Sequence, residues 1–377
     1  MSALWENHTV IVCVGTGGVG KTTVAAAMGV AAARRGRRTL VMTIDPARRL
    51  ANALGLDDVT SQPIEVDRQH LEAAGIELTA PLSILMPEVR SVFDELVAKV
   101  APNAAVRERI YANRMYQSFA SMLAGSLEYA AVEKLYDVVR EGRYDLVILD
   151  TPPSQNAATF LDAPTRVVDF MQHDALRWLL RPYMLAGKLS ARLLDFGSNF
   201  VFRTLGRFAG ADTLRELADF VLAFDGLYDG FYERARAVQR LLRDSSLAFV
   251  LVAAPAPTQR QAALRFAEEL RAQGLAPKAL ILNRVRPPLM ALTPEAIGAH
   301  FGALRSTLDP EALAGLTHAA HDEVVLATRD AQAVAAIRSE HPALVLLTLP
   351  ELAVDVHELT SLGELAGHFE ARTEPRS

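Results

Sequence analysis

The chain has 377 residues, which suffices for one large α/β domain or two domains of ordinary size. Half of the residues are hydrophobic and 22% are charged, and the net charge of -5 argues against nucleic acid as a partner. A single cysteine, Cys13, excludes an internal disulfide and any zinc site built from two of the chain's own thiols. No export signal opens the sequence and no apolar run could span a bilayer, so we expect a cytoplasmic protein without stable membrane insertion.

A glycine-rich stretch, GTGGVGKTT, follows the first predicted strand. The apolar run 10–14 predicts that buried strand, with Cys13 as a small core residue, and the small-residue run 24–33 predicts a helix after the stretch. The stretch matches the pattern G-x-x-x-x-G-K-[ST] in full. Backbone N–H groups of such a turn, together with the helix N-terminus, attract a polyphosphate. The residues predicted to surround the phosphates of ATP are Gly15, Thr16, Gly17, Gly18, Val19, Gly20, Lys21, Thr22 and Thr23.

Two side chains of this stretch carry the predicted chemistry. Lys21 should bridge the β- and γ-phosphates, and the Thr22 hydroxyl should take a coordination position on Mg²⁺.

The basic run 34–38 after the predicted helix has two interpretations. It is either a basic patch or, as we favour, the arginine-rich end of the helix, with Gly36 as its left-handed cap.

Two acidic residues follow predicted parallel strands. The run 39–44 predicts a strand that leads directly into Asp45, and the run 144–149 predicts another that ends in Asp150. Asp150 completes the Walker B pattern, in which a carboxylate supports Mg²⁺. Asp45 should lie in the crevice where such sheets bind ligands, although its local sequence also allows a surface turn. Lys21, Asp45 and Asp150 are therefore the predicted catalytic residues, and the predicted metal site consists of Thr22, Asp45 and Asp150.

The remaining apolar runs complete the predicted architecture. Strands are expected at 247–254, 279–283 and 344–350, with helices between them, and the pattern is weakest over 290–322. Recurring βα units predict an α/β fold of the P-loop NTPase type, with a mainly parallel central sheet covered by helices on both faces. The proline-rich segment 151–156 cannot be helical and is placed to sense the γ-phosphate.

Two long stretches read as helical insertions into this sheet. We expect one domain over 1–377, with insertions at about 87–143 and 165–245 that form a helical subdomain. The second insertion holds nearly half of the chain's aromatic residues. These residues form either a helix-on-helix core or a groove for a hydrophobic client. For any single aromatic residue we favour the core. For the insertion as a whole the two interpretations stand level, because Phe196, Phe200 and Phe202 lie where helical packing is expected to be least regular.

The order of these motifs resembles the ArsA-type anion-transporting ATPases and the related ATPase that targets tail-anchored membrane proteins. The resemblance covers nearly the whole chain and rests on GTGGVGKTT, TIDPARRL, VILDTPPSQNAATFLDAP, AAPAP, ILNRV and LPELAVDV. It implies a single P-loop domain with helical insertions that works as a nucleotide-gated dimer. It also implies that Asp45 positions the attacking water, that Asp150 lies near Mg²⁺, and that Asn283 recognises adenine. The segment around Pro350 and Glu351 resembles the loop that closes over the base.

Three departures from the family pattern change the functional expectation. Thr16 stands where the family has a lysine that crosses the dimer interface to the partner's phosphates, and a threonine cannot supply that cation. We therefore expect a heterodimer with a paralogue that keeps the lysine, with a homodimer as the other interpretation. The family's arsenite and zinc sites rest on cysteines, and Cys13 is wrongly placed for either, so we expect neither site. Pro153, Gln155 and Asn156 replace expected switch II residues and predict a stiffer switch.

The favoured function is a Mg²⁺-dependent ATPase whose nucleotide state controls binding of a hydrophobic client or partner protein. A second hypothesis is a regulatory subunit that binds nucleotide with negligible turnover, which the absence of the lysine supports and Asp45 opposes. A third is a positioning ATPase similar to ParA or MinD. Those proteins lack so large an insertion, and the segment 359–369 here carries glutamate and no lysine, which does not suit an anionic membrane surface.

Overall fold

The computed structural model describes residues 2–43, 50, 54, 62–114, 116, 127–151, 161–165, 227–287, 309–352 and 359–370. Several residues with predicted roles lie outside these ranges. They are Asp45, the segment 152–156, and the aromatic residues of the second insertion between 166 and 226. Their predicted roles therefore stay predictions.

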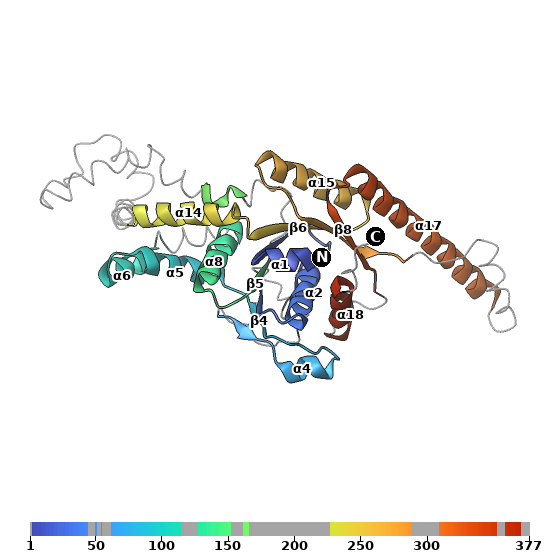
Figure 1. Ribbon diagram of the computed structural model, residues 1–377, viewed down its shortest axis with the longest axis horizontal. Helices are drawn as coiled ribbons and strands as arrows, with labels where there is room; N and C mark the ends of the chain where they lie inside the picture. The colour runs from blue at the N-terminus through green and yellow to red at the C-terminus, as the bar shows by residue number, and fades with distance from the viewer. Residues whose placement is uncertain are drawn as a thin grey trace, which may run out of the picture.

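An eight-stranded sheet forms the centre of the protein, with the strand order β3-β4-β2-β5-β1-β6-β7-β8 (Figure 1). All neighbouring strands are parallel except β3, which pairs with β4 in the antiparallel sense. The predicted mainly parallel sheet is confirmed. The strands are β1 (Val10–Val14), β2 (Thr39–Thr43), β3 (Ile64–Glu65), β4 (Leu82–Leu85), β5 (Leu146–Asp150), β6 (Leu247–Ala253), β7 (Ala279–Val285) and β8 (Val345–Pro350).

The central strands β2, β5, β1 and β6 are buried along their whole length because helices cover both faces of the sheet. Within β1, Val10, Val12 and Val14 belong to the core on one face, while Ile11 and Cys13 belong to the core on the other. This alternation follows from the opposite directions of successive side chains in a strand. The predicted core position of Cys13 is confirmed, since its side chain is fully buried.

Ten helices are described, and they divide between the two faces of the sheet (Figure 1). The face that contains Ile11 is covered by α1, α2, α4 and α18, and the opposite face by the other six. The helices are α1 (Ser2–Asn7), α2 (Lys21–Arg34), α4 (Arg68–Ala73), α5 (Val89–Val100), α6 (Ala104–Ala112), α8 (Leu127–Glu141), α14 (Tyr228–Leu242), α15 (Pro257–Ala272), α17 (Pro310–Glu340) and α18 (Leu359–Glu370).

Helix α2 lies closer to the sheet than a helix with larger side chains could. A Cβ atom added at Gly29 would lie 2.4 Å from Cγ2 of Val41, so glycine is required at this contact. On its other side α2 packs against α18, and the residues from Val24 to Ala33 are buried. The run of small residues thus allows α2 to fit between two layers. Gly36 adopts the expected left-handed conformation, with φ of 80°, directly after the helix.

The basic run after α2 contacts the chain itself. Arg34 forms an ion pair with Glu370. The guanidinium of Arg37 donates to the carbonyl oxygens of His8 and Asp145. Arg38 forms a bidentate ion pair with the Asp145 carboxylate. These contacts join the end of α2 to α18 and to the start of β5. They confirm that the run serves the fold locally.

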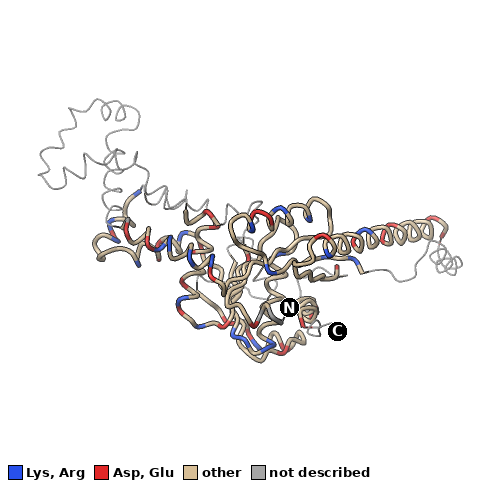
Figure 2. Tube along the Cα trace, turned by 45° about the horizontal axis from the view of Figure 1, so that its top comes forward, with Lys and Arg blue, Asp and Glu red and all other residues tan. Residues whose placement is uncertain are grey.

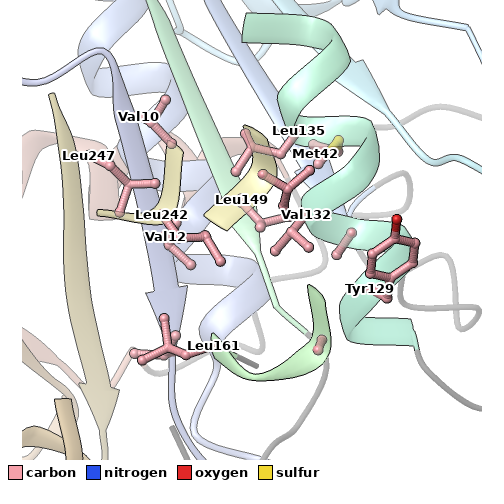
Figure 3. Close-up of a cluster of buried hydrophobic side chains, with 14 of the residues drawn as sticks. Val10, Val12, Met42, Tyr129, Val132, Leu135, Leu149, Leu161, Leu242 and Leu247 are labelled. Atoms are coloured by element: carbon pink, nitrogen blue, oxygen red, sulfur yellow. The ribbon is translucent and has the colours of Figure 1, made fainter. Parts of the chain in front are cut away.

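The described helices of the two predicted insertions pack together on one face of the sheet. Helices α5 and α8 of the first insertion contact each other, and α14 of the second contacts both. Figure 3 shows how α8 reaches the sheet, with Val132 and Leu135 beside Leu149 of β5 and Tyr129 farther along the helix. Phe231 of α14 is also buried in this core, as we expected of a single aromatic residue. The division into one domain with a helical subdomain remains a prediction.

Two parts of the fold differ from the sequence prediction. The expectation of little regular structure over 290–322 is wrong from residue 310 onward, because α17 begins there, with the Asp309 side chain accepting from the N–H of Ala312 as its cap. This helix runs away from the sheet and buries few residues, so it lacks a clear apolar stripe (Figure 1). Strands β3 and β4 were not predicted, and β4 is only four residues long.

Charged residues lie mainly outside the sheet. Figure 2 shows the central strands mostly in tan, while lysine and arginine alternate with aspartate and glutamate along the helices, including α17. Among the described helices, none combines the length and apolar character needed to cross a membrane.

Candidate nucleotide-binding site

The glycine-rich stretch connects the carboxyl end of β1 to the first turn of α2. Gly18 and Gly20 both have positive φ, 80° and 83°, in the region that side chains disfavour. At Gly15 the restriction is steric, since an added Cβ atom would lie 2.2 Å from the carbonyl oxygen of Val252. These three positions therefore require glycine. The loop places the N-terminal end of a 14-residue helix at the carboxyl edge of the sheet, where anions bind favourably.

Lys21 bends back over this loop. The residue is 7% exposed, and its Nζ donates to the carbonyl oxygens of Gly15 at 3.0 Å and Thr16 at 3.1 Å. The ammonium group is thus held within the turn that the motif assigns to phosphates. A polyphosphate at this turn would meet a cation already positioned there.

Thr22 and Asp150 meet at the same edge of the sheet. The Thr22 hydroxyl donates to Oδ2 of Asp150 at 2.6 Å, although the two residues are 128 positions apart. Asp150 is the last residue of β5 and is 1% exposed. The sequence placed both residues at a metal ion, and the structure brings them together. Hydroxyl and carboxylate oxygens form the hard donor set that Mg²⁺ prefers, so these residues fit that ion.

A second hydroxyl, which the sequence analysis missed, also reaches Asp150. Thr43 ends β2 next to Asp150 in the strand register, and its Oγ1 donates to the same Oδ2 at 2.9 Å. Its position as the last residue of a buried strand, one strand from the Walker B strand, is the signal that could have identified it. Thr22 and Thr43 together fix the orientation of the carboxylate.

Cys13 lies on the other side of Asp150. The two residues are partners in the pairing of β1 with β5, and burial raises the pKa of the thiol, with the Asp150 charge adding to the effect. The Thr151 hydroxyl donates to the Cys13 carbonyl oxygen at 2.8 Å. Cys13 therefore remains a neutral packing residue beside the site.

Thr16 lies in the glycine-rich loop between Gly15 and Gly17. The residue is partly exposed, but its Oγ1 atom is buried and has no hydrogen-bond partner within the described part of the chain. A buried hydroxyl without a partner costs free energy, and a bound phosphate oxygen would supply an acceptor for it. The hydroxyl fits an anionic ligand in the loop.

Asn283 lies under the loop from the side of β7. The residue is 4% exposed, and its Nδ2 donates to the carbonyl oxygen of Val19 at 2.9 Å. The next residue, Arg284, has a φ of 58°, and the β7–β8 register shifts between Leu282 and Val285, as in a β-bulge. The contact with Val19 was not predicted. The expected contact of Asn283 with adenine stays a prediction.

Pro350 and Glu351 lie next to the end of β7. Pro350 ends β8, and the N–H of Glu351 donates to the carbonyl oxygen of Val285 at 3.0 Å. The Glu351 carboxylate lies 3.3 Å from Nε of Arg286, which also contacts Asp330 of α17 at 3.6 Å through NH1. The segment predicted to close over the base is thereby linked to the long helix.

Comparisons with known proteins identify the family of this chain. Residues 8–199, just over half of the chain, match the family model described as anion-transporting ATPase. An uncharacterised protein of Streptomyces coelicolor is 29% identical over 277 residues, which cover 72% of this chain and 61% of that protein. A putative arsenical pump-driving ATPase of Halobacterium salinarum is 34% identical over 167 residues, 43% of this chain and 24% of that protein.

A third relative, ATPase ASNA1 homolog 1 of Paramecium tetraurelia, is 28% identical over 163 residues, covering 42% of this chain and 45% of that protein. The chain thus spans about three fifths or less of the length of these three relatives. The match to the family model includes the glycine-rich loop and Asp150.

Proposed function

This chain belongs to the anion-transporting ATPase family, and we propose that it binds ATP with Mg²⁺, hydrolyses it, and works as a dimeric switch. The observation that carries this proposal is the 2.6 Å hydrogen bond from Thr22 to Asp150, which joins the end of the glycine-rich loop to the Walker B strand. The Thr22 hydroxyl and the Asp150 carboxylate, two potential oxygen ligands of Mg²⁺ from distant parts of the chain, thus meet beside a loop that fits phosphates.

Thr22 and Asp150 are the described residues that would hold Mg²⁺, which when bound offsets phosphate charge during transfer. The Thr22 hydroxyl can keep donating to Asp150 while a lone pair faces the metal, because a hydroxyl has one donor and two acceptor sites. Thr43 would keep Asp150 oriented through its own hydrogen bond. By the family resemblance, Asp45 would position the attacking water.

Lys21 would exchange partners when nucleotide binds. In this structure its ammonium group donates to two loop carbonyl groups, of Gly15 and Thr16. A charged phosphate oxygen is a stronger acceptor than a neutral carbonyl oxygen, so the ammonium group would move to the phosphates. The short displacement within one turn keeps this rearrangement small.

Binding and turnover of Mg·ATP by the purified chain test the proposal. Lys21→Ala should abolish tight ATP binding, because no other described cation lies in the loop. Asp45→Asn should leave binding intact and stop turnover, because an amide cannot take the proton of the attacking water. Unchanged ATP affinity in Lys21→Ala would contradict the proposed site, and normal turnover in Asp45→Asn would remove that residue from the mechanism.

We further propose that the physiological partner is a paralogue that carries lysine at the position of Thr16. The unpaired Thr16 hydroxyl can serve a phosphate in its own loop, but it brings no cation to a partner's site. Purification of the tagged chain with Mg·ATP, followed by native mass spectrometry, should recover such a paralogue at equal stoichiometry. Recovery of a homodimer or a monomer alone would refute the heterodimer.

The same residue supports a second candidate function, a nucleotide-binding regulatory subunit with negligible turnover. Steady phosphate release by the pure chain would exclude it. Thr16→Lys offers a further test, since a missing cation predicts faster hydrolysis in that variant.

The proposed client is a hydrophobic segment bound by the insertion at about 165–245. In the described part of that insertion, Phe231 belongs to the core and is not offered to a client.

A further inference from the structure

The Asn283 side chain connects two segments that are far apart in sequence. Its Nδ2 atom donates to the carbonyl oxygen of Val19, 264 positions away, at 2.9 Å. Because Asn283 is only 4% exposed, solvent competes little for this hydrogen bond. The bond therefore restrains the peptide group that precedes Gly20, which is the N-cap residue of α2.

Close packing at Gly20 restrains the same peptide. A Cβ atom added at Gly20 would lie 2.4 Å from Nδ2 of Asn283, so the amide occupies the space that any larger residue would need. The positive φ of Gly20, 83°, independently requires glycine. Both the close contact with the Asn283 amide and the backbone conformation therefore require glycine at position 20.

The backbone after Asn283 adopts an unfavourable conformation at this point. Arg284 has a φ of 58°, which L-residues other than glycine rarely adopt, and it lies within the irregular β7–β8 pairing. A bulge changes the direction of side chains at the end of a strand. Here the irregular pairing includes Asn283, whose side chain contacts the glycine-rich loop, called the phosphate loop below.

We infer that Asn283 is a positioning residue for the phosphate loop, beyond the adenine contact that the family resemblance implies. This inference rests on the proposed nucleotide site. One N–H of the amide is committed to Val19, which leaves the other N–H and Oδ1 for a base. The same side chain thus holds the phosphate loop and is available to a base, so its loss weakens phosphate binding even when no base is present.

Tripolyphosphate with Mg²⁺ is the probe that separates these two roles, because it has the phosphates of ATP without base or ribose. Calorimetric titration of the full chain should show that Asn283→Ala weakens tripolyphosphate binding about tenfold, the effect of losing one buried hydrogen bond. Asn283→Asp should weaken it further, because a carboxylate oxygen would face the Val19 carbonyl oxygen. Equal tripolyphosphate affinity in wild type and Asn283→Ala, with ATP affinity reduced, would overturn the inference.

Arg284→Gly is the matched control, since it changes the neighbouring residue, relieves the positive φ and leaves the amide in place. Its tripolyphosphate affinity should stay within about twofold of wild type. Lys21→Ala tests the proposed function separately. If wild type binds neither ATP nor tripolyphosphate, the nucleotide site itself is refuted, and the inference with it.

Hydrogen exchange of the ligand-free chain tests the positioning role of Asn283 independently of any binding measurement. Loss of the Val19 contact should speed amide exchange in the segment 15–24 of Asn283→Ala, while exchange in β5 stays unchanged. Unchanged exchange in the loop would contradict the positioning role whatever the binding data show. A melting curve identifies a variant that has simply lost its fold.

Discussion

The buried ion-pair cluster around Arg234 yields the strongest stability prediction. Arg234 on α14 pairs with Glu133 at 2.5 Å and with Asp137, both on α8, and its guanidinium lies 4.4 Å from the centre of the Tyr136 ring. Glu133 is 1% exposed, and the side chain of Arg234 is 9% exposed. The cluster therefore joins the first and second predicted insertions through charges that water cannot easily solvate.

Replacement of Arg234 by methionine keeps much of the side-chain volume and removes the positive charge. Glu133 would then remain buried without its cation, and breaking a buried pair in this way typically costs about 3 to 5 kcal/mol. With an unfolding entropy of about 2.1 cal/mol/K per residue, that loss lowers the melting temperature by about 4 to 6 °C. Burial already raises the pKa of Glu133, so protonation should reduce the penalty as the pH falls.

Thermal unfolding followed by circular dichroism measures this effect. Arg143→Met is the matched control, because Arg143 pairs with Glu141 but both side chains are about half exposed. Exposed pairs contribute little, so the control should shift the melting temperature by at most about 1 °C. The double variant Arg234→Met/Glu133→Gln should recover part of the loss. Equal shifts for Arg234→Met and Arg143→Met would refute the reasoning about burial.

Three further outcomes follow from the described contacts. Thr43→Val removes one of the hydrogen bonds to Asp150 and should weaken Mg²⁺-dependent ATP binding several-fold in a titration, with little change when EDTA replaces Mg²⁺. Gly29→Ala overpacks the α2 contact with the sheet and should cost about 1 to 3 kcal/mol in urea unfolding; an unchanged midpoint would contradict the steric argument. Hydrogen bonds from Arg38 lower the pKa of Asp145 from 3.8 to about 2, so this pair stabilises the fold above about pH 4 and loses its effect as the pH falls toward 2. Asp145→Asn should therefore lower the melting temperature equally at pH 7 and pH 5 and by less at pH 3.

The sequence was sufficient for the parts of the fold that local pattern determines. Continuous apolar runs predicted β1, β2 and β5, and the glycine pattern identified the loop between β1 and α2, because each depends on neighbouring residues. The proximity of Thr22 and Asp150 also followed, since Asp150 ends one parallel strand and Thr22 lies in the first turn of the helix after the loop that follows another.

Other contacts between distant segments were beyond the sequence pattern. The bond from Asn283 to Val19 joins β7 to the loop after β1, and only the order of strands in the sheet brings them together. The hydroxyl of Thr43 was missed for the same reason, because its partner lies in the adjacent strand and not in the adjacent sequence. The first part of α17, residues 310–322, was missed because the helix is exposed over much of its length, which removes the apolar periodicity that identifies a helix.

The central claim, a Mg²⁺-dependent ATP site built on the glycine-rich loop and Asp150, is tested most directly by ATP titrations with Mg²⁺ and with EDTA. In the wild-type chain Mg²⁺ should tighten ATP binding at least about tenfold, because the metal joins the phosphates to Thr22 and Asp150. In Asp150→Asn that dependence on Mg²⁺ should largely disappear. Equal ATP affinity with and without Mg²⁺ in wild type, or a full Mg²⁺ effect in Asp150→Asn, would contradict the account.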